Sequence, residues 1–160
     1  MNTLRHRSLK DQRGFNLIEL MIVIAIIGLL IGVGSYAWSS MIKSGNETTA
    51  AQTLEKIRTF QTQYASKNRG KFASFDELIK TVGLDEKFAG ERPVSNGYTF
   101  ILTVEEQTGT KPASFKISAE PQVPGSGVTA TGTRFFYTDS TISTIKYSEE
   151  GPATAESPSI

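Results

Sequence analysis

One carboxylate in this sequence lies where charge is costly. Glu19 stands inside the largely apolar segment 15–22, which reads Phe-Asn-Leu-Ile-Glu-Leu-Met-Ile. A carboxylate at the centre of a bilayer costs roughly 2.5–3.5 kcal/mol, and less near an interface, so it needs a cation. The first Lys or Arg downstream is Lys43. We therefore expect Glu19 to have a specific cationic partner, unless it merely lies in the headgroup region.

A chain break just before Phe15 would create that partner. The new α-amino group would lie four residues from Glu19, at the start of the apolar segment. The unpaired N–H groups and the positive dipole end of a helix beginning there also favour a nearby carboxylate. Cleavage after Gly14 would therefore place a positive charge close to Glu19.

The element that must position Glu19 is a long apolar segment. Residues 20–42 are uncharged, and as an α-helix of about 23 residues they would measure roughly 34 Å, enough to cross a bilayer. Tyr36 and Trp38 lie toward the far end, where amphipathic rings suit a membrane interface. Basic residues precede the run and only Lys43 follows it closely, so we expect a cytoplasmic N-terminus.

The residues before this run form a short basic leader. Residues 1–14 are strongly basic, although the net charge of the whole chain is only +1. The charged leader residues are Arg5, Arg7, Lys10, Asp11 and Arg13. An ordinary secretory signal peptide has a similar start, but its apolar stretch usually has only about 7–15 residues. The small residues within 32–37 imitate the cleavage site of such a peptide, so this alternative stays open.

Residues 10–20 read Lys-Asp-Gln-Arg-Gly-Phe-Asn-Leu-Ile-Glu-Leu. This segment resembles the processing motif of type IV prepilins and of the related pseudopilins of type II secretion. In that family a membrane peptidase cuts on the cytoplasmic side after the glycine and methylates the new N-terminal residue. The resemblance implies that Gly14 ends the leader and that Phe15 is the N-methylated terminus. It also implies that Glu19 attracts the amine of an adjoining subunit during assembly.

The sequence departs from the family pattern in two places. Asn16 stands where the family more often has threonine, and no proline precedes Pro93, whereas many members carry one in the membrane helix. Any kink or unwound stretch must therefore come from Gly28, Gly32 and Gly34. Gly28 and Gly32 also form a G-x-x-x-G pair, which permits close helix approach, although membrane helices also simply tolerate glycine.

Beyond the apolar run the pattern becomes that of a small α+β body. Apolar residues recur every three or four positions after residue 43, which predicts an amphipathic continuation of the helix. Ser74 and Glu77 fit a capping box for a short helix ending near Gly83. Strands are predicted at 98–104, 115–119, 134–138 and 142–147. We therefore expect a long N-terminal helix, membrane-spanning in its first half, packed on an antiparallel β-sheet of three to four strands.

These patterns divide the chain into five segments. The first is the basic leader, and the second is a transmembrane helix that would also form the core of a filament. An amphipathic continuation, a small α+β body and a flexible tail follow. Their predicted bounds are 1–14, 15–42, 43–70, 71–147 and 148–160.

Catalytic chemistry is hard to build from these residues. The chain has no cysteine, and its one histidine, His6, lies in the leader. The mature chain therefore lacks the usual Ser-His and Cys-His arrangements and a histidine metal cluster. Asp139 with Glu149 or Glu150 has oxygens of the kind calcium takes, but no ligand spacing supports a site. The basic cluster 67–71 is better interpreted as a solvated helix end than as a DNA contact.

The sequence thus predicts a structural subunit rather than an enzyme, without cofactor, metal or nucleic-acid partner. The leading hypothesis is a pilin of a type IV pilus-like filament, with roles such as adhesion or motility. A type II secretion pseudopilin is the alternative, and a membrane-anchored binding module that never polymerises is a further hypothesis. A secreted enzyme behind a conventional signal peptide would require cleavage beyond Ala37 and a catalytic apparatus that the sequence does not show. The resemblance implies four partners: further copies of the chain, a prepilin peptidase and methyltransferase, an inner-membrane assembly platform and an ATPase.

The resemblance also implies where the protein is found. We expect a single-pass precursor in the bacterial inner membrane. The mature subunit would then enter an extracellular pilus or a periplasmic pseudopilus.

Overall fold

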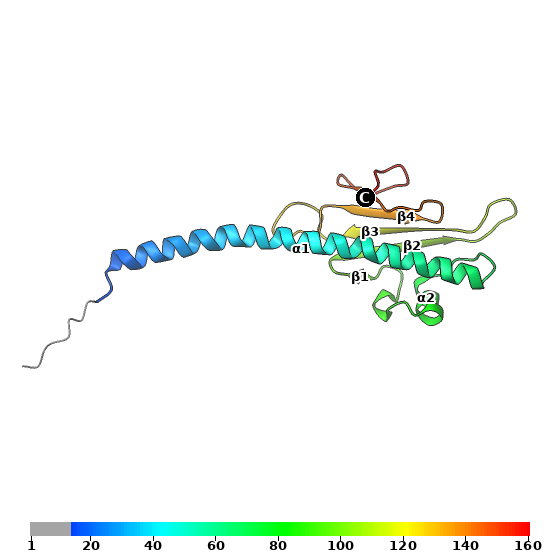
Figure 1. Ribbon diagram of the computed structural model, residues 1–160, viewed down its shortest axis with the longest axis horizontal. Coiled ribbons are helices and arrows are strands. Elements are labelled where there is room, and N and C mark those ends of the chain that lie inside the picture. The colour runs from blue at the N-terminus through cyan, green and yellow to red at the C-terminus, as the bar shows by residue number, and fades with distance from the viewer. Residues whose placement is uncertain (1–13) are drawn as a thin grey trace, which may run out of the picture. The chain divides into compact units, whose positions relative to one another are not determined.

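The computed structural model describes residues 14–160 of the chain (Figure 1). Except for Gly14, the predicted leader lies outside the described residues, and so does His6. The chain divides into two compact units, Met1–Ser35 and Tyr36–Ile160. We describe each unit by itself, although helix α1, Leu17–Lys67, contributes residues to both.

The described part of the first unit is mostly helix. Residues 14–16 are irregular, and α1 begins at Leu17. Every residue from 14 to 35 is exposed. The helix continues without interruption through Gly28, Gly32 and Gly34. The expected apolar helix is therefore present, and none of its residues up to Ser35 is buried within the chain.

The second unit is a helix packed on an antiparallel sheet, as predicted (Figure 1). The sheet has five strands in the order β1-β2-β3-β4-β5, rather than three to four, and each strand pairs with its neighbour in sequence. The strands are β1 Val94–Ser95, β2 Tyr98–Glu105, β3 Ser114–Pro121, β4 Phe135–Asp139 and β5 Lys146–Ser148. Two short helices precede them, α2 Phe75–Val82 and η1 Glu86–Phe88.

The core lies between α1 and one face of the sheet. Ala50, Leu54 and Ile57 of α1 are buried, at the three- and four-residue spacing that the sequence shows. The buried strand residues facing them alternate along each strand: Tyr98, Phe100, Phe115, Ile117, Ala119 and Phe136. Farther along the same helix, the buried amide of Gln61 exchanges hydrogen bonds with the backbone of Ala73, at 2.6 and 2.9 Å. The polar group at the end of the apolar stripe is therefore satisfied.

The predicted boundaries of α2 are confirmed in detail. The Ser74 hydroxyl accepts a hydrogen bond from the backbone N–H of Glu77, and the Glu77 carboxylate accepts one from the backbone N–H of Ser74. Gly83 ends the helix with a φ of 78°, a left-handed conformation that glycine adopts without strain. The capping-box pattern therefore sufficed to place this helix.

The missed strand β1 is only two residues long. It pairs with β2 through the turn Asn96-Gly97, whose residues have φ angles of 50° and 72°. Two positive φ values are typical of the tight hairpin turns that Asn-Gly sequences favour. The dipeptide was therefore the signal for this hairpin, although a two-residue strand leaves no periodicity to detect.

The C-terminal region differs from expectation. Strand β5 begins at Lys146, so most of the predicted strand 142–147 is irregular. The sequence predicts a flexible tail over 148–160, whereas its last residues are hydrogen-bonded to the sheet: Tyr147 N–H donates to the Pro158 carbonyl (2.9 Å) and Ile160 N–H to the Ile145 carbonyl (3.1 Å). Ala153 is also buried. These contacts cover the outer edge of β5, which would otherwise expose unpaired backbone groups.

Candidate functional site

The predicted cleavage junction is accessible. Gly14 and Phe15 lie in the irregular stretch before α1, and Phe15 is 91% exposed. An exposed peptide bond outside a helix is accessible to a peptidase, because no hydrogen-bonded helix must first be unwound. The geometry therefore suits the predicted cut between these two residues, which itself stays a prediction.

Asn16 caps the first turn of α1, and Glu19 completes the cap. The Asn16 side-chain oxygen accepts a hydrogen bond from the backbone N–H of Ile18, and the Glu19 carboxylate accepts one from the backbone N–H of Asn16, both at 3.3 Å. Such reciprocal bonds satisfy N–H groups that a helix end leaves free. Glu19 therefore stands in the first turn, where the helix dipole favours a negative charge.

Sequence reasoning missed this role of Asn16. From the sequence, Asn16 was identified only as a replacement for the family's usual threonine. An N-capping residue followed three positions later by glutamate is nevertheless a known helix-start pattern, and asparagine is among the best N-cap residues. The spacing from Asn16 to Glu19 was therefore sufficient to predict the cap.

The helix surface around Glu19 is apolar and uncovered. Leu17, Ile18, Leu20 and Met21 are all exposed. Among the described residues, α1 is the one helix long and apolar enough to cross a membrane, a test that a signal sequence near the N-terminus also passes. Soluble proteins rarely expose a contiguous apolar surface of this extent, so the helix is consistent with a membrane-anchored precursor.

The three membrane-segment glycines all lie on this exposed helix. A Cβ atom added at Gly28, Gly32 or Gly34 would meet nothing within 4 Å. Gly28 and Gly32 share one helix face, because residues four apart are neighbours on an α-helix. That face is free to receive another helix, and the assigned roles in packing or flexibility stay predictions.

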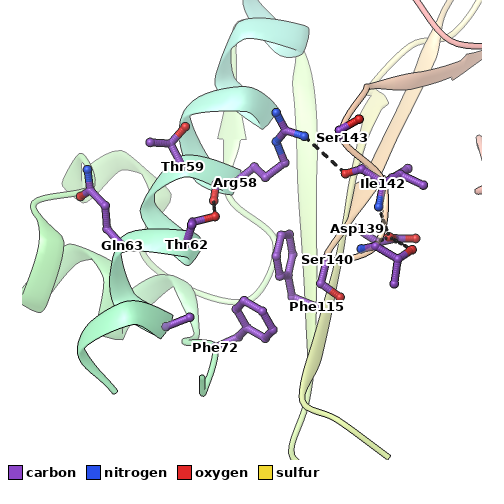
Figure 2. A pocket seen from close by; sticks show the side chains of 12 residues that line it. Arg58, Thr59, Thr62, Gln63, Phe72, Phe115, Asp139, Ser140, Ile142 and Ser143 are labelled. Carbon is purple, nitrogen blue, oxygen red and sulfur yellow. Dashed lines mark hydrogen bonds between the residues drawn. The ribbon is translucent and has the colours of Figure 1, made fainter. Parts of the chain in front are cut away.

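A groove in the second unit was not predicted from the sequence. It has a volume of about 600 Å³ and lies between α1, represented by Arg58 and Thr62, and the segment 139–143 (Figure 2). Phe72 and Phe115 form its apolar end. One guanidinium nitrogen of Arg58 donates to the carbonyl of Ile142 (3.3 Å) across the groove. The charge of Arg58 is thus already engaged in holding its walls together.

Asp139 holds the turn after β4. Its carboxylate accepts hydrogen bonds from the Thr141 hydroxyl (2.6 Å), the Thr141 N–H (2.7 Å), the Ile142 N–H (3.1 Å) and the Tyr137 hydroxyl (2.9 Å). Burial alone would raise the pKa of Asp139, but these bonds outweigh it and hold the pKa below its ordinary value. Burial, together with the bond to Asp139, raises the pKa of the Tyr137 hydroxyl to about 12. Asp139 is therefore a structural carboxylate.

The structure does not gather the acidic residues named as calcium candidates. The oxygens of Asp139 are occupied by the turn, and Glu149 accepts a hydrogen bond from Arg134 at 3.2 Å. Within residues 14–160 no three acidic or histidine side chains converge as metal ligands would. At the end of α1 the cationic side chains of Lys67, Arg69 and Lys71 are exposed.

Comparison with known proteins bears on the N-terminal region. Residues 9–35 match the family model described as the prokaryotic N-terminal methylation motif. The matched range contains the predicted junction at Gly14 and Phe15, the capping carboxylate of Glu19 and all three membrane-segment glycines. No solved structure matched the chain significantly. The N-terminal segment therefore carries the prepilin-type methylation signal that type IV pilins and pseudopilins share.

Proposed function

We propose that the chain is a structural subunit of a type IV pilus-like filament. It is cleaved after Gly14, methylated on the new N-terminus Phe15 and assembled through its apolar helix. One observation carries the proposal: the methylation motif ends in a helix whose residues 17–35 are all exposed. Lipid covers this surface in the precursor, and the helices of other copies cover it in the filament.

Glu19 has a specific task in this assembly. In the uncut chain its carboxylate accepts a hydrogen bond from the backbone N–H of Asn16. When helices bundle and exclude water, the carboxylate needs a full positive charge to offset a cost of roughly 2.5–3.5 kcal/mol. The α-amino group of Phe15 on an incoming or neighbouring copy supplies that charge. Incorporation of a subunit is then favoured only after cleavage has created the amine.

The proposed role is structural rather than catalytic. The absence of cysteine and the placement of His6 before the cleavage site support this, because the mature chain then lacks the commonest nucleophile-activating groups. The working partners are a prepilin peptidase and methyltransferase, an inner-membrane assembly platform and an ATPase that drives extraction. The precursor resides in the inner membrane with its N-terminus in the cytoplasm.

Mass spectrometry of the protein from its native membrane tests the processing step. We expect an N-terminal peptide that begins at Phe15 and is heavier by one methyl group. An intact leader would indicate a plain membrane anchor. A terminus within 35–39 would show that the apolar segment is a secretory signal peptide, and the filament proposal would be wrong.

A matched pair of glutamate substitutions tests the assembly step. Glu19→Ala should abolish filaments while the cleaved protein stays in the membrane, because the carboxylate that attracts the amine is gone. Glu106→Ala removes an exposed glutamate beyond β2 and should leave assembly unchanged. Shearing of whole cells releases a surface pilus and leaves a periplasmic pseudopilus behind. Normal filaments from Glu19→Ala would contradict the proposed role of Glu19.

A further inference from the structure

The connection between β3 and β4 carries no charge until its last residue, Arg134. Residues 122–133 read Gln-Val-Pro-Gly-Ser-Gly-Val-Thr-Ala-Thr-Gly-Thr, without Asp, Glu, Lys or Arg. Val123 and Val128 are exposed, Val128 to 61%. Connecting loops on a water-facing surface usually carry polar and charged side chains, so the uncharged stretch 122–133 with two exposed valines suits a less polar environment.

This loop is fixed to α1 by three polar residues on one helix face. The Lys43 ammonium donates to the Ser126 carbonyl (2.8 Å), and the Asn46 amide donates to the Thr131 carbonyl (2.9 Å). Glu47 lies one helical turn after Lys43. Its carboxylate accepts hydrogen bonds from the Thr133 N–H (2.8 Å) and the Thr133 hydroxyl (2.7 Å). The loop therefore meets α1 immediately after the uncharged run 20–42, ahead of the helix residues that pack on the sheet.

These contacts bury most of the first two charged side chains after the uncharged run, Lys43 and Glu47. Lys43 is only 9% exposed, and the side chain of Glu47 is 14% exposed. A lysine near the end of a membrane helix normally extends its ammonium into water. Here the ammonium points instead to loop carbonyls, so the uncharged surface continues past residue 42.

Two segments near the loop contain no charged residue either. Trp38 and Met41 are exposed on α1 just before the loop contacts. The β1–β2 turn adjoins the loop, because a Cβ placed on Gly97 would come within 2.7 Å of the Thr131 Cβ. Residues 36–42, 94–97 and 122–133 contain no Asp, Glu, Lys or Arg. We name these three segments the collar.

The collar loop also satisfies much of its own backbone. Within it, Gly125 N–H donates to the Gly132 carbonyl (3.1 Å) and Thr131 N–H to the Val123 carbonyl (2.9 Å). Irregular backbone enters a low-water region only where its polar groups have partners. The collar thus combines exposed apolar side chains, withdrawn charges and internally bonded backbone.

We propose that the collar lies in the headgroup region of the bilayer that α1 crosses, and so seats the body on the outer leaflet before assembly. The inference rests on the membrane-anchored precursor of the proposed function. The occupant is lipid because the collar continues the uncharged membrane segment directly, and because Trp38 is an aromatic residue of the kind found at membrane interfaces. The same surface becomes exposed when the subunit leaves the membrane.

Single-tryptophan chains test the proposal, since Trp38 is the only tryptophan. The full chain is reconstituted in phosphatidylcholine vesicles, either plain or brominated near the start of the acyl chains. Three forms are compared: the native chain, Trp38→Phe with Val128→Trp, and Trp38→Phe with Thr110→Trp. Thr110 is exposed in the connection before β3, at the opposite end of that strand from the collar loop.

We expect the native chain and the Val128→Trp form to show blue-shifted emission and a loss of intensity in brominated vesicles. The Thr110→Trp form should show neither change. Quenching at Trp38 without quenching at position 128 would overturn the collar proposal and leave the membrane anchor intact. No quenching at either would overturn the anchor and the proposed function with it.

Two further outcomes would also overturn the collar proposal. Equal quenching at position 110 would mean that the body has no preferred membrane-facing end. A blue shift at position 128 without bromine-dependent loss would mean that a second copy of the chain, rather than lipid, covers the loop.

Discussion

Replacing Asp139 by asparagine tests how much one buried carboxylate contributes to the body. Asp139 is 7% exposed and accepts four hydrogen bonds from its own turn and from Tyr137. Asparagine preserves the size of the side chain but removes its charge. Its amide nitrogen also cannot accept a bond from the Tyr137 hydroxyl. The substitution therefore weakens the hydrogen bonds without creating a cavity.

The magnitude follows from the change in acceptor charge. Hydrogen bonds to charged groups contribute roughly 1.5–3 kcal/mol, against roughly 0.5–1.5 kcal/mol for neutral pairs, so each bond weakens by about 1 kcal/mol. Because the four bonds share one carboxylate, their losses do not add fully. We expect Asp139→Asn to lower the free energy of unfolding by about 2–3 kcal/mol at neutral pH.

The effect should also depend on pH. The pKa of Asp139 is lower in the folded chain than its ordinary value. Such a group stabilises the fold above its unfolded pKa of about 3.9 and loses that contribution as the pH falls through the folded value. Asparagine does not titrate, so the stability difference between the native chain and the variant should narrow in acid.

The free energy of unfolding is measured at each pH by urea titration of the full chain in detergent micelles. Near-ultraviolet circular dichroism reports on the aromatic core. Glu106→Gln, on an exposed side chain, serves as the control and should match the native chain. Equal unfolding midpoints for Asp139→Asn and the native chain at neutral pH would refute the reasoning. So would a stability difference that stays constant as the pH is lowered.

Two further substitutions test local geometry. Asn16→Ala should cost about 1 kcal/mol of helix stability, because it removes the N-cap. The loss should appear as faster amide hydrogen exchange in the first turn of α1. Asn16→Ser keeps the cap and serves as the control. Gly97→Ala should destabilise the body, because its Cβ would lie 2.7 Å from the Thr131 Cβ at a φ of 72°. Gly127→Ala meets open space and should be nearly neutral in the same urea experiment, and equal losses would contradict this explanation.

The parts of the fold that were predictable depend on local rules. The capping box at Ser74 and Glu77 needs only a few adjacent residues, and it placed α2 correctly. The long helix and strands β2 to β4 follow from periodicity over several residues. The Asn16 cap and the Asn96-Gly97 hairpin obey rules just as local, so both were present in the sequence without being used.

The parts that were not predictable depend on residues far apart in the chain. Lys43 contacts Ser126, and Glu47 contacts Thr133, across separations of 83 and 86 residues. No periodicity or spacing in the sequence predicts such pairs. In the sequence, a lysine whose ammonium extends into water cannot be told from one whose ammonium binds a loop carbonyl. The C-terminal residues paired to β5 are another case, because their composition alone is that of a mobile segment.

The sequential order of the sheet has a kinetic consequence. Each strand pairs with its neighbour in the chain, so the β2–β3 hairpin closes a short loop. The contacts of Lys43 and Glu47 with the β3–β4 loop must instead close loops of more than 80 residues. We expect the hairpin to form in the folding transition state and the helix-to-loop bonds to form after it. Weakening the hairpin should therefore lower the folding rate, whereas Lys43→Met should mainly raise the unfolding rate. The bonds that hold the collar loop to α1 thus also determine the lifetime of the folded subunit.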